Sequence, residues 1–123
     1  MGESILKEKS FDFALAIVAT YKKLRETGEY VLSKQMLRCG TSIGANIAEA
    51  NMAQSLADFT AKMDIALKEA NETLYWLSLL NRAEYLAAPE ADVLISDCKE
   101  LLRMLISTTK KTAPRQQQLN TEH

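Results

Sequence analysis

The side chains that most often carry chemistry in proteins are few and scattered in this sequence. Its single histidine is His123, the last residue. Serine and cysteine nucleophiles commonly need a histidine base, and the di-iron sites of many helical bundles need Glu-x-x-His pairs. A structural zinc site needs four clustered cysteine or histidine ligands. We therefore expect no catalytic residue of these kinds, no metal site and no cofactor.

The two cysteines do not suggest redox chemistry or metal binding. Cys39 and Cys98 lie far apart, outside any C-x-x-C spacing, and each belongs to an apolar helical pattern. We expect both to be reduced, partly buried packing residues.

Carboxylates are the remaining candidates for acid and base catalysis. The candidates are Asp64, Glu69, Glu72, Asp97 and Glu100. All of them lie outside the apolar stripes of their helices, where solvated charges are ordinary. The segment 39–44, Cys-Gly-Thr-Ser-Ile-Gly, lacks the lysine of a phosphate-binding P-loop. We predict that the protein is not an enzyme.

A group of basic residues surrounds the turn expected between the first two helices. The formal net charge of the chain is -1 and its pI is about 5.9, so nucleic-acid binding would need such a local patch. A solvated rim that binds nothing is the alternative interpretation. The candidate nucleic-acid contacts are Lys22, Lys23, Arg25, Lys34 and Arg38.

Small residues recur every four positions in the second helix, at Gly40, Gly44 and Ala48. A glycine inside a helix costs about 1 kcal/mol relative to alanine, so two of them call for a packing reason. Their spacing places them on one face, where another helix could approach closely. Well over half of this helix surface is apolar or small, which we interpret as a sign of self-association.

Polar and aromatic residues extend the predicted contact between copies. Arg38, Ser42, Asn46 and Glu49 fall near one line, which either forms a hydrogen-bonded ladder at a subunit contact or faces water. Trp76 leaves the apolar stripe of its helix, as interface aromatics often do. The residues that we predict at the oligomer interface are Gly40, Gly44, Ala48, Asn46, Glu49 and Trp76.

Four segments with a helical apolar period position these side chains. The first helix is expected from a cap at Ser10 to Gly28, the second from about Ser33 to Met52, the third after a cap at Ser55, and the fourth from Pro89. The first helix carries two neighbouring apolar lines, one through Phe11 and Leu15 and the other through Phe13 and Ile17. It therefore has two sides to cover.

The connections between these segments are short, and no strand pattern competes with them. The predicted fold is all-α, an antiparallel up-and-down four-helix bundle. It occupies residues 1–111, and residues 112–123 are polar, without a period, and expected to be disordered. No apolar run reaches the roughly 20 residues that span a membrane, and Met1 to Ser10 lacks a signal-peptide core. We expect a cytoplasmic protein with no membrane partner.

Two segments of the sequence resemble a known family. They are Gln35-Met-Leu-Arg-Cys-Gly-Thr-Ser-Ile-Gly-Ala-Asn-Ile-Ala-Glu49 and Ala66-Leu-Lys-Glu-Ala-Asn-Glu-Thr-Leu-Tyr-Trp-Leu77. Both are similar to the four-helix bundle proteins encoded within intervening sequences of bacterial 23S ribosomal RNA genes. The Ser-Ile-x-x-Asn-Ile-Ala-Glu core is the specific part, and the similarity extends from about Phe11 to about Ile106. Ala50 departs from the glycine expected after the glutamate.

The resemblance implies a homo-oligomer, with a pentamer as the expected form. It also implies a distant similarity to the accessory variability protein of diversity-generating retroelements. That relative suggests RNA, or an enzyme that acts on nucleic acid, as the partner. A non-enzymatic, RNA-associated accessory factor is therefore the leading hypothesis, and a protein interaction scaffold without nucleic-acid binding is the alternative.

Overall fold

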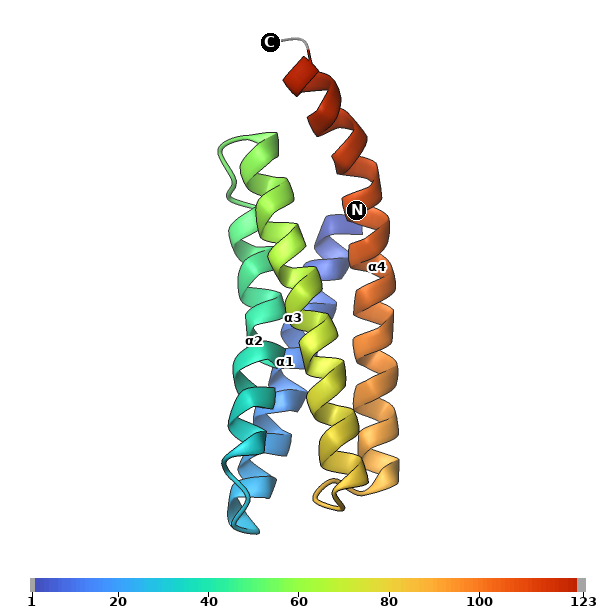
Figure 1. Ribbon diagram of the computed structural model, residues 1–123. Helices are drawn as coiled ribbons and strands as arrows, with labels where there is room; N and C mark the ends of the chain where they lie inside the picture. The colour runs from blue at the N-terminus through green and yellow to red at the C-terminus, as the bar shows by residue number, and fades with distance from the viewer. Residues whose placement is uncertain (1, 122–123) are drawn as a thin grey trace.

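The computed structural model describes the backbone of residues 2–121 and the side chains of residues 5–112. This part of the chain is an all-α four-helix bundle, which confirms the predicted fold class. Its helices are α1 (Gly2–Glu26), α2 (Leu32–Ala50), α3 (Leu56–Arg82) and α4 (Ala88–Thr121). Successive helices run in opposite directions (Figure 1). Among the residues that the structure describes, no helix is both long enough and apolar enough to cross a membrane.

Local signals set the turns. Gly28 adopts a φ of 95°, and its N–H donates to the carbonyl of Arg25 at 3.0 Å. Glycine adopts this left-handed conformation without the cost that a Cβ imposes, so α1 ends here as predicted. At the start of α3, the Ser55 hydroxyl accepts a hydrogen bond from the N–H of Asp58 at 3.0 Å. This interaction is the predicted N-cap.

The core is formed by inward-facing apolar side chains from all four helices. Its fully buried members include Ile17, Met36, Ile43, Met63, Leu77, Leu101 and Leu105. Both cysteines are free and buried, as predicted. Burial raises the pKa of the Cys98 thiol to about 12, and the nearby Cys39 adds to this shift. The thiols therefore remain protonated at neutral pH and act as packing groups.

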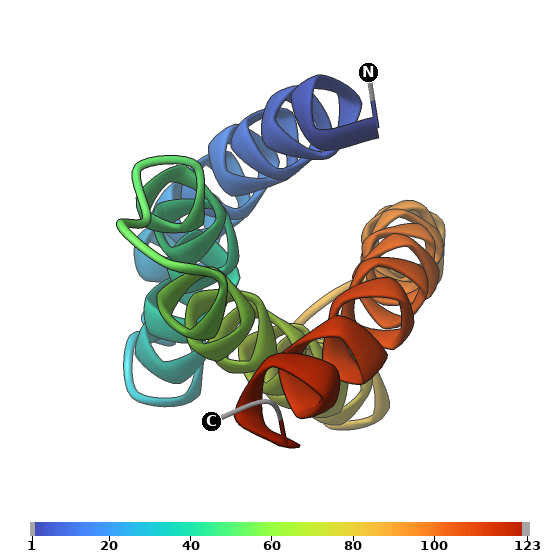
Figure 2. The same ribbon diagram turned by 90° about the horizontal axis from the view of Figure 1, so that it is seen from above.

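The helices follow one another around the bundle in chain order (Figure 2). The contact between α1 and α4 is the smallest of the four contacts between neighbouring helices. An ion pair between Lys9 Nζ and a Glu100 carboxylate oxygen, 2.7 Å apart, spans this seam. The hydrogen bond between them raises the pKa of Lys9 and lowers that of Glu100. Glu100, one of the carboxylates considered for catalysis, thus has an ion-pair partner.

The first helix begins earlier than the sequence predicts. Ser10 lies inside α1 rather than at its cap, and its hydroxyl donates to the carbonyl of Lys7 at 3.0 Å. Leu6, in the preceding turn, is buried in the core. The prediction of an N-cap at Ser10 was wrong for two reasons. The Ser10 hydroxyl finds its hydrogen-bond acceptor within the helix, and the burial of Leu6 favours a helical backbone in the turn that precedes Ser10.

The fourth helix continues beyond the predicted boundary between residues 111 and 112. Its backbone is helical to Thr121. The division into a bundle of residues 1–111 and a disordered tail of residues 112–123 stays a prediction. The segment from Arg115 to Leu119 consists of arginine, glutamine and leucine, all of which favour helix. The expectation for His123 lies outside the described residues.

Candidate functional site

The glycines of α2 bring α1 close to it. A Cβ at Gly40 would lie 2.9 Å from Cγ2 of Ile17, and a Cβ at Gly44 would lie 3.3 Å from the backbone oxygen of Ser10. Real Cβ atoms essentially never approach other heavy atoms within 3.0 Å. The close helix approach inferred from the glycine spacing is therefore present, and the helix that approaches is α1 of the same chain.

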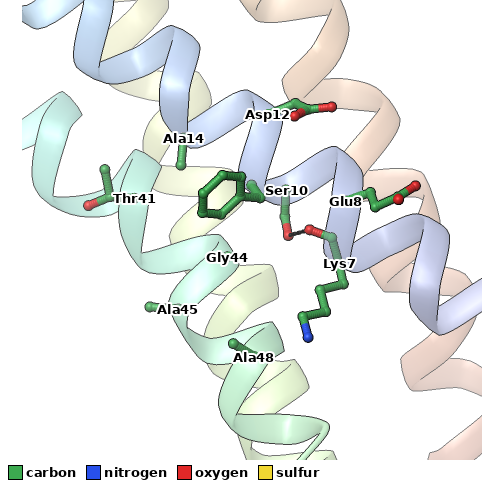
Figure 3. Close-up of a pocket in the computed structure, with 10 residues that line it drawn as sticks. Lys7, Glu8, Ser10, Asp12, Ala14, Thr41, Gly44, Ala45 and Ala48 are labelled. Carbon is green, nitrogen blue, oxygen red and sulfur yellow. Dashed lines mark hydrogen bonds between the residues drawn. The ribbon is translucent and has the colours of Figure 1, made fainter.

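A groove lies along the outer side of this α1–α2 seam. Its volume is about 920 Å³, and its lining includes Ala14 from α1 and Gly44, Ala45 and Ala48 from α2. Figure 3 shows the small side chains of the two helices flanking the groove, with Ser10 bonded to Lys7 at its α1 side. Small residues lower the walls of the groove, because they let the two backbones approach without filling the space outside them.

Large apolar side chains stand exposed beside this groove. Phe11, which lines it, is 64% exposed, and Leu15, one turn further along α1, is 56% exposed. They belong to the second apolar line of the first helix, whereas Phe13 and Ile17 of the other line are buried. We call the surface formed by Phe11, Leu15 and the groove the α1–α2 face. A face of this kind is suited to binding another apolar surface.

The hydroxyl groups in the groove lining donate to backbone carbonyls. The Ser10 hydroxyl is buried and already donates to a backbone carbonyl. The neighbouring Thr41 hydroxyl likewise donates to the carbonyl of Leu37 at 2.8 Å. Among the described residues, no group of three or more histidine, cysteine, aspartate or glutamate side chains could hold a metal ion.

A polar network joins α2 to α3. The Arg38 guanidinium donates to Glu69 at 3.2 Å and also to Glu72, and Trp76 Nε1 donates to Glu72 at 3.0 Å. The hydrogen bonds from Trp76 and Arg38 lower the pKa of Glu72. The same pairing raises the pKa of Arg38. Two of the carboxylates considered for catalysis therefore serve as ion-pair partners of one arginine.

The polar line on α2 finds its partners within the chain. The Asn46 amide donates to the backbone oxygen of Ser42 at 2.9 Å and to its hydroxyl at 3.1 Å. Glu49 lies 3.5 Å from Lys62 of α3. Arg38 pairs with α3 as well, so Arg38 and Glu49 form ion pairs across the outer side of the α2–α3 seam. The placement of Asn46 and Glu49 at a subunit contact remains a prediction.

Trp76 lies at the same seam and is half-buried. Its ring meets that of Tyr75 edge to face, with 5.1 Å between the centroids. Tyr75 is largely exposed. The pair provides an aromatic surface on α3. The interface role of Trp76 also remains a prediction.

The structure does not gather the predicted basic set into one free cluster. Lys23 lies 3.9 Å from a carboxylate oxygen of Glu90 on α4, and Arg38 is bound to α3. Arg25 lies over the ring of Tyr21, 6.0 Å from its centroid. Lys22 and Lys34 are exposed. Three members of the set are thus engaged by three different groups of the same chain.

Sequence reasoning did not name Phe11 and Leu15 as interface residues. The signal that could have identified them is the pair of apolar lines on the first helix, since one helix rarely buries both lines in a small bundle. The sequence alone does not show which line faces the core. That choice depends on Gly40, whose missing side chain receives Ile17.

Comparisons with known proteins relate nearly the whole chain to one group. Residues 3–107 match the family described as 23S rRNA-intervening sequence protein. A crystal structure from Bacteroides thetaiotaomicron VPI-5482, described as a protein with unknown function from the S23 ribosomal protein family, is 53% identical in sequence. The match covers 89% of this chain and 99% of that chain, with a TM-score of 0.87. No curated protein matches the chain.

Proposed function

The chain belongs to the 23S rRNA-intervening sequence protein family, and from this premise we propose that it is a non-enzymatic, homo-oligomeric accessory factor associated with RNA. The observation that carries the homo-oligomeric part of the proposal is the exposed α1–α2 face, and the family match is what supports the association with RNA. An exposed apolar surface beside a groove is typical of a protein interaction site. In a homo-oligomer, contact with a neighbouring copy would bury this face away from water.

A second copy is the occupant that we propose for the α1–α2 face. Burial of apolar surface stabilises association, and Phe11 and Leu15 offer large side chains that a neighbouring copy can cover. The charged groups Lys7, Glu8 and Asp12 lie in the groove lining and supply a polar rim. A pentamer is the form that we propose for the assembly.

Light scattering of the purified protein tests the assembly. We expect a particle several times heavier than the 13.7 kDa chain. Leu15→Glu should reduce it to single chains, because it places a charge in the buried interface. Val93→Glu on α4 is the matched control, since Val93 is 61% exposed and lies away from the groove. That control should assemble like the wild type.

Two results would reject this part of the proposal. If the wild-type chain is monomeric at high concentration, the α1–α2 face does not mediate self-association. A Leu15→Glu chain that assembles normally would place the contact elsewhere. Gly44→Leu is unsuitable as a test, because its side chain would press on the backbone of Ser10 and disturb the bundle itself.

A protein interaction scaffold without nucleic-acid binding is the second candidate. The dispersal of the predicted basic set and the net charge of -1 favour it. Binding of labelled, structured RNA at two salt concentrations separates the candidates. The RNA-associated role predicts an affinity that falls steeply as salt rises, whereas a pure scaffold shows no binding even at low salt.

A further inference from the structure

The second half of α4 is basic in a chain that is nearly neutral. Between Glu100 and Glu122 the sequence contains no acidic residue. The same stretch contains Arg103, Lys110, Lys111 and Arg115. The local charge balance therefore differs from that of the whole chain, which has 15 basic and 16 acidic residues.

The basic side chains with described positions on this helix are exposed. Arg103, Lys110 and Lys111 are exposed, as is Lys99 one turn earlier. None of the four has an ion-pair partner among the described residues. Lys99, Arg103 and Lys110 are spaced by four and seven residues, so they share one helix face over about 17 Å. We call these four residues the α4 basic surface.

Stabilisation of the helix end does not account for these charges. Cations interact favourably with a helix dipole only within the last turn. The last turn of α4 contains no basic residue, because the helix continues to Thr121. Lys23 and Arg25, by contrast, do lie in the last turn of α1. The helix dipole therefore accounts for Lys23 and Arg25, beside the turn between α1 and α2, but not for the α4 basic surface.

The surroundings of the surface suit an extended polyanion. Ser107 is exposed one turn after Arg103, and hydroxyl side chains commonly join arginine and lysine in contacts to phosphate. The end of α4 reaches beyond the other three helices in Figure 1, so that its backbone projects past the bundle. The α4 basic surface shares no residue with the α1–α2 face, which is formed by α1 and α2.

We propose that the α4 basic surface binds the phosphate backbone of RNA. This inference rests on the proposed RNA-associated function and assigns its contact surface. It moves the contact away from the basic set around the first turn. Electrostatic contacts of this kind give affinity without base specificity.

The test compares two variants with equal charge changes. Arg103→Glu/Lys110→Glu alters the α4 basic surface, and Lys22→Glu/Lys34→Glu alters exposed lysines of the other basic set. Binding of a fluorescent RNA hairpin to the full chain is measured by anisotropy at roughly 50 and 200 mM salt. The α4 variant should bind at least about tenfold more weakly, with a salt slope smaller by about two. The control should stay within about twofold of the wild type.

The possible outcomes separate this inference from the function on which it rests. A wild-type chain that does not bind the hairpin rejects the RNA-associated role itself. Wild-type binding that the α4 variant retains, or that both variants lose equally, overturns only the α4 assignment. Light scattering and circular dichroism on both variants should show the assembly and helix content of the wild type.

Discussion

The α1–α2 and α2–α3 seams join the same helix to its two neighbours by opposite means. At the α1–α2 seam, missing side chains at Gly40 and Gly44 let the helices approach, and the outer side is left apolar and grooved. At the α2–α3 seam, Arg38 and Glu49 reach across to charged partners on α3. The first seam leaves an apolar surface facing water, and the second covers its outer side with ion pairs.

This difference is the reason why we propose the α1–α2 side, and not the α2–α3 side, as the contact between copies. At the α2–α3 seam, a further partner would have to remove charged groups from water, which carries a desolvation cost. A seam that leaves Phe11 and Leu15 exposed gains from being covered. Three substitutions in the single chain separate the contributions of close packing, turn capping and ion pairing at the two seams.

The largest effect is expected at the close contact of α1 and α2. Gly40→Val should lower the free energy of unfolding by about 3 kcal/mol, because the added side chain must displace the buried Ile17. Combining it with Ile17→Ala exchanges the large and small partners. The double variant should be more stable than the sum of the single effects by at least about 1 kcal/mol.

Urea unfolding gives these free energies. Ala45→Val is the control on the same helix, since Ala45 is exposed in the groove, and it should cost no more than about 1 kcal/mol, mostly the lower helix propensity of valine. Strictly additive effects of Gly40→Val and Ile17→Ala would show that the two residues do not restrict each other. The close-packing account of the seam would then be wrong.

An intermediate effect is expected at the turn that joins α1 to α2. Glu29 is only 7% exposed, and its carboxylate accepts hydrogen bonds from the N–H groups of Leu32 and Ser33, each at 2.8 Å. Burial raises its pKa, but these bonds outweigh burial and lower it overall. Glu29→Gln should cost about 1 kcal/mol at neutral pH.

The pH dependence of this cost follows from the lowered pKa. The ionised form is favoured in the folded state, so its stabilisation is complete above the usual glutamate pKa of 4.5. It is lost as the pH falls through the lower, folded-state pKa. The difference between wild type and Glu29→Gln should therefore shrink in acid, as followed by thermal unfolding from pH 7 to about pH 3. Exposed Glu26→Gln is the control, and a constant difference would contradict the capping role.

The smallest effect is expected at the charged α2–α3 seam. Arg38→Gln should cost about 0.5 kcal/mol, because the pair is half exposed to solvent and to salt. The cost should fall further in about 1 M salt. Trp76 is the single tryptophan and shares Glu72 with Arg38, so its fluorescence reports both unfolding and the local change. Lys34→Gln is the control, and an effect above about 2 kcal/mol would mean that the network is structurally essential.

The sequence reveals the helices because their apolar residues recur with a helical period. Gly28 and Ser55 carry explicit turn and cap signals, and both act as those signals predict. Ser10 carries the same kind of cap signal without acting as a cap, because Leu6 before it is buried. A potential cap residue alone therefore does not show whether the residues before it are buried in the core and continue the helix.

The interaction surfaces are harder to predict from the sequence, because they depend on contacts between distant parts of the chain. Arg38 is recognisable as a basic residue, but its partner Glu72 lies 34 positions away on another helix. Gly40 indicates a close helix contact, yet only the fold identifies that contact as Ile17 of the same chain. The sequence therefore indicates that a seam exists but leaves open whether one copy or two form it.

The order of the helices around the bundle also has a kinetic consequence. Because α1 and α4 share the smallest contact, most of the core forms between helices that follow each other in the chain. Such neighbours meet by closing short loops, which costs little conformational entropy. We therefore expect the two helical hairpins, α1–α2 and α3–α4, to form early, and the contact between α1 and α4, which are far apart in the sequence, to form late.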